Sequence, residues 1–232
     1  LMICEKEELP VSPATSQALT AGMGDDYATM LYFNILTGEF VKELPHIGYD
    51  LQFGNQPADK NIFLNSSNFM FVRNFGPVPF ASVSDTILAQ NWRFDFPTGN
   101  PNRTAIGAWF NADGTSKNEV FVIDRGFDEK GINIGYIKMQ VLAADATKYT
   151  LRIGSLDNVL DTIVEVFKDE DKELIQFSFS SLAAEDVEPN KNDWHFLFTQ
   201  YTDYDITDEG DTIPYLVRGV LINQTNTEIA RL

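Results

Sequence analysis

The sequence predicts an all-β fold: a β-sandwich or an open barrel of many short, mostly antiparallel strands, with little helix. Apolar side chains recur at every second position in short segments such as residues 49–53, and a period of two is that of a strand. Gly, Asn and Pro separate these segments throughout, as they do in sandwiches and barrels. A hydrophobic content of 44%, with 18 Phe, is enough to form a core without disulfides.

The expected strands follow one another along the whole chain. They cover residues 27–33, 40–44, 49–53, 61–65, 69–72, 91–96, 105–110, 119–124, 135–142, 148–153, 160–167, 174–179, 194–200 and 214–223. Residues 128–131 have the composition of a tight hairpin turn, and residues 203–211 are expected to form an acidic turn. Only residues 83–90 and 180–187 carry a weak helical pattern.

Two parts of the chain repeat one pattern. Residues 49–53 are followed by residues 62–65, and residues 194–198 are followed by residues 220–223. In each pair an alternating strand that begins with an aromatic residue precedes an apolar strand that ends in Asn. This echo suggests two related β layers within one β domain, residues 21–232, and a chance similarity is the alternative.

Charge and composition exclude several classes of protein. The formal net charge is −17, from 34 acidic and 17 basic residues, so the surface repels nucleic acid and disfavours direct docking on anionic lipid. The chain has one Cys and two His, His46 and His195. An internal disulfide is therefore impossible, and we expect no metal site of the zinc type.

The N-terminal segment resembles a lipid anchor followed by a tether. Cys4 follows the short apolar run Leu1-Met2-Ile3, like the cysteine at the end of a bacterial lipoprotein signal peptide, although Ile3 departs from the usual small residue. Residues 1–3 would then be a signal-peptide remnant, and residues 4–20 a flexible tether with an acylated Cys4, each buried methylene contributing about 0.8 kcal/mol. An unmodified terminal thiol is the alternative.

No catalytic motif is visible, so we expect no enzyme. The sequence contains no GxSxG, Walker loop, HExxH or GxGxxG pattern. Acidic residues gather at residues 124–129 and 203–211. Runs of this kind in loops are usually solvated faces. The alternatives are a glycosidase carboxylate pair and, for residues 203–211, a Ca²⁺ site with oxygen ligands, although the spacing departs from that of an EF-hand.

A few side chains could bind iron. His46 follows Pro45 in an expected loop, where an imidazole is free to act as a ligand, and Met23, Met30 and Met70 offer thioethers. Core packing is the alternative for Met70. His195 precedes Phe196 in an alternating segment, so we expect it at the surface or hydrogen-bonded.

Several segments together resemble the HmuY-like surface lipoproteins of Bacteroidetes. They are WRFDFPTGNP (92–101), TAIGAW (104–109), VIDRG (122–126), GYIKMQ (135–140), Glu188-Pro189 with Trp194, FTQYT (198–202) and YLVRGVLIN (215–223). The resemblance spans about residues 27–230. In addition, Lys6-Glu7-Glu8 resembles the surface-export signal of these lipoproteins.

The resemblance implies an all-β protein of the outer membrane, anchored by lipid and exposed on the cell surface. Such proteins bind haem or a porphyrin through His or Met ligands on loops and deliver it to a TonB-dependent receptor. The loop at residues 111–114, where one ligand is expected, contains neither His nor Met. The alternative is a non-catalytic accessory subunit of an outer-membrane receptor or assembly complex, without a haem ligand.

Overall fold

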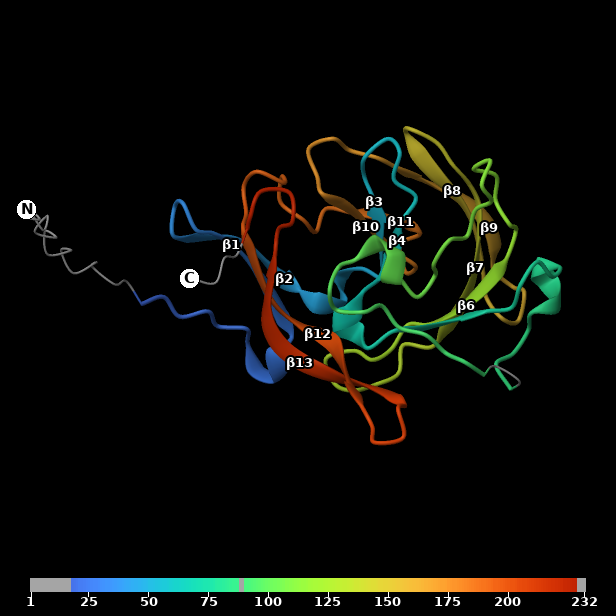
Figure 1. The fold of residues 1–232 in the computed structure, drawn as a ribbon, viewed down its shortest axis with the longest axis horizontal. Coiled ribbons are helices and arrows are strands. Elements are labelled where there is room, and N and C mark those ends of the chain that lie inside the picture. Colours follow the sequence, from blue (N-terminus) through green and yellow to red (C-terminus); the bar gives the residue numbers. More distant parts are fainter. Residues whose placement is uncertain (1–17, 88–89, 229–232) are drawn as a thin grey trace, which may run out of the picture.

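A computed structural model of the chain describes residues 18–87 and 90–228. Within these residues the prediction of an all-β fold is confirmed, because thirteen strands form three antiparallel sheets and helix occurs only as three-residue 3-10 turns (Figure 1). The weak helical patterns were misleading: the described part of residues 83–90 is not helical, and residues 180–187 contain a short strand. Residues 1–3, Cys4 and the tether as far as residue 17 lie outside the described residues.

Sheet A combines strands from the two ends of the described chain (Figure 1). Its order is β13-β12-β1-β2, and its strands are β1 (Thr29–Asn34), β2 (Glu39–Pro45), β12 (Phe196–Ile206) and β13 (Thr212–Ile222). The expected acidic turn is shorter than the sequence indicated. Both strands continue into it and leave only residues 207–211 as the connection.

Sheets B and C make up the rest of the fold. Sheet B has the order β11-β10-β3-β4, with β3 (Leu51–Gly54), β4 (Ile62–Leu64), β10 (Leu174–Ser178) and β11 (Ala183–Glu185). Sheet C runs in chain order through β5 (Phe71–Asn74), β6 (Val120–Asp124), β7 (Tyr136–Ala144), β8 (Lys148–Gly154) and β9 (Asp161–Phe167). Five 3-10 turns connect strands: η1 (Asp25–Tyr27), η2 (His46–Gly48), η3 (Ser66–Asn68), η4 (Phe80–Ser82) and η5 (Pro101–Arg103).

The main core lies between sheets B and C. Phe53 and Phe177 from sheet B and Phe121 and Ile153 from sheet C belong to one cluster of buried side chains. A second cluster, which includes Met30, lies against sheet A. Because both faces of sheet C are covered near β6, alternate residues of that strand are apolar on each side.

Two expected strands do not form. Residues 91–96 and 105–110 contribute only isolated bridges, Arg93 to Val72 and Phe110 to Ser116. The carboxylate of buried Asp95 accepts hydrogen bonds from the backbone N–H groups of Leu64 and Ala105, both at 2.6 Å. A side chain thus takes the place of a neighbouring strand, which the alternating pattern could not reveal.

The first of the two echoed hairpins, β3–β4, is closed by Asn65. The Asn65 backbone N–H donates to the Asp50 carbonyl at 2.8 Å. Its side-chain amide donates to the carbonyls of Tyr49 and His46 at 2.9 and 2.8 Å. Because Asn65 is fully buried, these bonds satisfy backbone carbonyls near the hairpin without water.

The second hairpin, β12–β13, is closed by Asn223 in the same way. The Asn223 backbone N–H donates to the His195 carbonyl at 2.9 Å, and its amide donates to the carbonyls of Trp194 and Lys191 at 3.0 and 2.6 Å. In both hairpins the three acceptors have the same spacing. The first is the residue that lies opposite the Asn, the second is the residue immediately before that one in the sequence, and the third lies three positions before the second. The segments that share a sequence pattern therefore share these hydrogen bonds.

The two hairpins also occupy the same place in their sheets. The backbone N–H of Asp50 donates to Phe177 O in β10, and that of His195 donates to Phe33 O in β1, both at 2.8 Å. Sheet A, read as β2-β1-β12-β13, therefore matches sheet B, read as β11-β10-β3-β4. Strands β1–β4 and β10–β13 form two repeats that exchange hairpins: β1–β2 joins β12–β13, and β10–β11 joins β3–β4.

Candidate functional site

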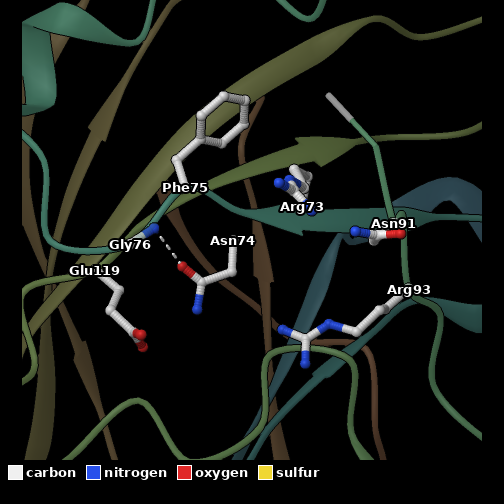
Figure 2. Close-up of a pocket in the computed structure, with 7 residues that line it drawn as sticks. All are labelled: Arg73, Asn74, Phe75, Gly76, Asn91, Arg93 and Glu119. Carbon is white, nitrogen blue, oxygen red and sulfur yellow. Dashed lines mark hydrogen bonds between the residues drawn. The ribbon is translucent and has the colours of Figure 1, made fainter. Parts of the chain in front are cut away.

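An open hollow of about 490 Å³ lies where β5 ends and β6 begins (Figure 2). We call it the arginine hollow, and its lining residues are Arg73, Asn74, Phe75, Gly76, Asn91, Arg93 and Glu119. The lining includes no His, Met, Cys or Tyr. This hollow is lined by two arginines but offers no side chain that usually binds haem iron.

A second hollow, of about 250 Å³, contains one of the predicted ligand residues, His46. We call it the His46 hollow. It lies among η2, η3, the loop between β6 and β7, and strands β12 and β13, and its lining residues are Asp26, His46, Ser67, Asn68, Phe127, Asp128, Glu129, Gly131, Gln200 and Leu216. Residues that are far apart in the sequence thus form one site around an imidazole.

The hydrogen bonds of His46 indicate which ring nitrogen carries the proton. Nδ1 lies 2.9 Å from Asn68 Oδ1, an acceptor, so Nδ1 donates. Nε2 lies 3.3 Å from Gln200 Nε2, which also donates to the Ser67 carbonyl at 2.9 Å, so His46 Nε2 is on the acceptor side of a long contact. Burial lowers the pKa of His46, and the Asn68 contact only partly opposes this effect. The imidazole is therefore neutral at pH 7, with its lone pair on Nε2.

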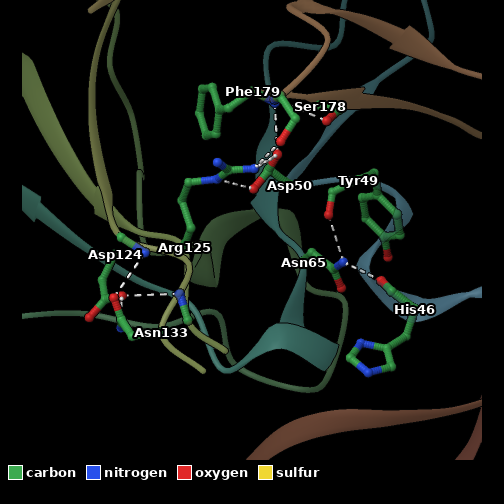
Figure 3. Close-up of polar contacts among 12 residues, drawn as sticks. His46, Tyr49, Asp50, Asn65, Asp124, Arg125, Asn133, Ser178 and Phe179 are labelled. Carbon is green, nitrogen blue, oxygen red and sulfur yellow. Dashed lines mark hydrogen bonds and ion pairs between the residues drawn. The ribbon is translucent and has the colours of Figure 1, made fainter. Parts of the chain in front are cut away.

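The backbone of His46 explains why the ring can face the hollow. Figure 3 shows the His46 carbonyl directed at the amide of Asn65, while the ring extends below it and makes no contact with that amide. Closure of the β3–β4 hairpin uses only the His46 backbone, so the ring is left to contact Asn68 and Gln200.

The loop after β6 is held against sheet B by an ion pair (Figure 3). Arg125 Nε and Nη2 donate to the two carboxylate oxygens of Asp50 at 2.7 and 3.0 Å. Asp50 also accepts the backbone N–H of Phe179 at 2.7 Å. Paired contacts of this kind orient a guanidinium firmly, and they position the loop that continues into the wall of the His46 hollow.

Gly126 allows this loop to approach η3 closely. Its φ is +73°, and a Cβ at this position would lie 1.7 Å from the carbonyl oxygen of Asn68. The next residue, Phe127, donates its backbone N–H to that same oxygen at 2.9 Å. Only glycine tolerates both the backbone conformation and the contact, so the wall of the hollow depends on this residue.

The charges in the lining of the His46 hollow have one sign. Asp26, Asp128 and Glu129 belong to the lining, and it includes no Lys or Arg. Acidic side chains around a small opening repel anionic groups and favour neutral or cationic ones. The two hollows therefore differ in both charge and ligand chemistry.

The structure does not bring the predicted methionines to His46. Met70 is buried in the cluster between sheets B and C, and Met30 is buried in the cluster at sheet A. Met23 is half-buried before η1. None of the three lines the His46 hollow, so their role as iron ligands stays a prediction.

His195 differs from its expectation. It lies just before β12, is only 8% exposed, and its Nδ1 has no hydrogen-bond partner among the described residues. The alternation predicts that it faces away from Trp194 and Phe196, yet the residue is buried. Position in an alternating segment does not distinguish a solvent face from a second buried face.

Sequence reasoning missed Asn68 and Gln200, which contact the His46 ring. One signal could have identified Asn68, because Asn65 and Asn68 have the same spacing as Asn223 and Asn226 in the second hairpin. Nothing local marks Gln200, which lies 154 residues from His46 in the sequence.

The described residues offer no metal cluster and no membrane-spanning helix. They contain no group of three or more His, Cys, Asp or Glu side chains placed to hold a metal ion. They also contain no helix long and apolar enough to cross a membrane. No protein-family model, curated protein or solved structure matches this chain.

Proposed function

We propose that this chain is a non-catalytic binding protein of the bacterial outer-membrane surface, that it binds haem or a porphyrin, and that it delivers this ligand to a TonB-dependent receptor. The observation that carries the proposal is the neutral imidazole of His46, which lines a hollow although the residue is only 2% exposed. The location and the receptor rest on the lipoprotein-like residues around Cys4 and on the family resemblance.

The surroundings of His46 suit an iron ligand. Histidines that bind metals almost always donate their other ring N–H to a carboxylate or carbonyl, which fixes the ring and raises its basicity. Asn68 Oδ1 takes that role at 2.9 Å from His46 Nδ1. Because His46 is only 2% exposed, iron binding at Nε2 would displace the Gln200 amide, whose contact with Nε2 is long at 3.3 Å and which also donates to the Ser67 carbonyl.

The size and charge of the hollow limit how a porphyrin would bind. A volume of about 250 Å³ is below the roughly 300–1,000 Å³ of most small-molecule sites, so most of the ring would remain outside. Phe127 and Leu216 belong to the lining and are 41% and 36% exposed, so they offer apolar surface for it. The acidic lining disfavours propionates, which would point to solvent.

A haemin titration tests the proposal. We expect a Soret shift that saturates, that disappears in His46→Ala, and that returns when free imidazole is added to that variant. His195→Ala is the matched control and should titrate like the parent chain. A parent chain without a Soret shift, or a His46→Ala variant that titrates normally, contradicts the proposal. Circular dichroism of each variant confirms the fold.

The anchor has a separate test. In cells, the parent chain should sediment with outer membranes and incorporate labelled fatty acid, whereas Cys4→Ser should do neither. Protease added to intact cells should degrade the parent chain, because we propose that it faces outward. An unacylated Cys4 in the parent chain contradicts this part of the proposal and leaves the haem titration unaffected.

A second candidate function, an accessory subunit of a membrane complex, is favoured by strand β13. Among the described residues β13 pairs only with β12, and apolar Ile213, Tyr215 and Val220 on it are exposed. A long apolar edge of this kind is a template for a strand from another protein, here the receptor. Purification in mild detergent should then recover a β-barrel partner that Val220→Lys loses, and a chain that purifies alone excludes this function.

A further inference from the structure

We propose that the arginine hollow binds a small organic anion, a carboxylate on a flat apolar body, at a site distinct from the His46 hollow. Neither guanidinium group of this hollow forms an ion pair among the described residues, and an aromatic ring lies beside that of Arg73. The inference does not depend on haem binding, because none of the lining residues is an iron ligand.

The backbone positions the two arginines as neighbours. Arg73 belongs to β5, and the preceding residue, Val72, exchanges two backbone hydrogen bonds with Arg93 at 2.8 and 2.9 Å. Figure 2 shows Arg93 extending from this bridge towards the side of the hollow where Asn74 and Glu119 lie. The exposed Arg93 guanidinium is thus attached to a fixed backbone rather than to a free loop.

Neither guanidinium is neutralised within the described residues. The ion pairs there involve Lys42, Arg125, Lys148, Arg152 and Lys172, and not Arg73 or Arg93. Glu119 borders the hollow without pairing with either. In addition, Arg73 Nε is buried and has no hydrogen-bond partner there. In a chain with a net charge of −17, two unpaired cations at one hollow favour an external anion, and a planar fork of N–H groups suits a carboxylate.

The remaining lining residues indicate which kind of group the carboxylate of the ligand is attached to. The Arg73 guanidinium carbon lies 5.8 Å from the centroid of the Phe75 ring, so a positive charge lies next to an aromatic ring. Asn74 Oδ1 accepts the Gly76 N–H at 2.7 Å, which leaves the Asn74 amide NH₂ to donate. A volume of about 490 Å³ is within the usual range for a small molecule, roughly 300–1,000 Å³.

The overall charge excludes large anions as occupants. A polyanion would lie against a large area of the acidic surface and be repelled by it, whereas a small anion within a Debye length of the arginines experiences mainly their local field. A single carboxylate attached to an aromatic ring therefore matches the hollow better than a nucleic acid or an anionic membrane does.

An NMR titration of the haem-free full chain tests the inference, with benzoate as the probe. We expect backbone amide shifts at Gly76, Asn91 and Glu119 that saturate with benzoate, and at least tenfold weaker binding of benzamide and of inorganic phosphate. Arg93→Gln should weaken benzoate binding at least tenfold. Arg218→Gln removes the same charge elsewhere and should leave the affinity unchanged.

Three results would overturn the inference. Benzamide that binds as tightly as benzoate would show that the charge is irrelevant, and phosphate that binds as tightly would show that the flat body is irrelevant. Equal effects of Arg93→Gln and Arg218→Gln would show that only net charge matters. Arg93 is exposed, so we expect its variant to fold, and its dispersed NMR spectrum verifies this. Arg93→Lys, which keeps the charge but loses the fork, should bind with intermediate affinity.

Discussion

The two Asn-closed hairpins have the same hydrogen bonds but very different surroundings. β3 and β4 are short strands, and the apolar residues of their inner face are buried between sheets B and C. β12 and β13 each have eleven residues, and much of β13 is exposed. The comparison shows that the hydrogen-bonding pattern around the Asn does not require a buried hairpin, so the repeats were free to differ in packing.

The repeats also differ at the position that forms the site. His46 and Lys191 are equivalent, because the carbonyl of each accepts a hydrogen bond from the closing Asn. The His46 side chain lines a hollow, whereas Lys191 Nζ donates to the Glu170 carbonyl. Where the backbone performs the structural role, the side chain can specialise, and in this protein only one copy carries an imidazole.

The largest expected effect distinguishes the two closing asparagines. Asn65→Ala should lower the free energy of unfolding by about 3 kcal/mol, because it leaves the buried carbonyls of His46 and Tyr49 without their donor. Asn223→Ala should lower it by only about 1 kcal/mol, since Asn226 Nδ2 also donates to the same two carbonyls at 2.8 and 3.2 Å. Urea denaturation measures both, and equal losses would contradict the argument.

A second effect concerns the asparagines three positions later. Asn68→Ala should weaken haemin binding by about 10- to 100-fold, because it removes the group that orients His46, as loss of a partner behind a metal ligand does elsewhere. Asn226→Ala is the matched control and should leave haemin affinity unchanged. Absorbance titration measures both. If Asn68→Ala binds haemin as tightly as the parent chain, the contact between Asn68 and His46 does not contribute to haemin binding.

The smallest effect is a pH dependence. A proton competes with iron for Nε2, so an imidazole with the ordinary pKa of about 6.5 would lose roughly fourfold in affinity at pH 6.0. Burial lowers the pKa of His46, so less of the imidazole is protonated at pH 6.0 and we expect a smaller loss than this. Haemin titrations at pH 7.5 and 6.0 check this, and a fourfold loss would indicate an imidazole exposed to water.

Lys191→His, which adds an imidazole at the equivalent position, should bind no second haemin.

The sequence predicted the fold better than the site, for physical reasons. Period-two patterns identify β8 and β9 almost residue by residue, because strand pairing and alternation are local. The echo marked Asn65 and Asn223 for the same reason. The burial of His46 was not visible, since Asn68 and Gln200, which contact its ring, lie 22 and 154 residues away. Asp95 likewise bonds across segments that the pattern assigned to strands.

The exchange of hairpins between the two repeats affects how the chain folds. In sheet A, Leu31 pairs with Phe198, almost at the other end of the described chain, and β1–β2 alone would be a two-stranded ribbon of marginal stability. During synthesis these first strands must therefore wait for the last hairpin, and closing so long a loop is slow. A nascent chain whose sheets cannot be completed early therefore stays open until the last hairpin has been made.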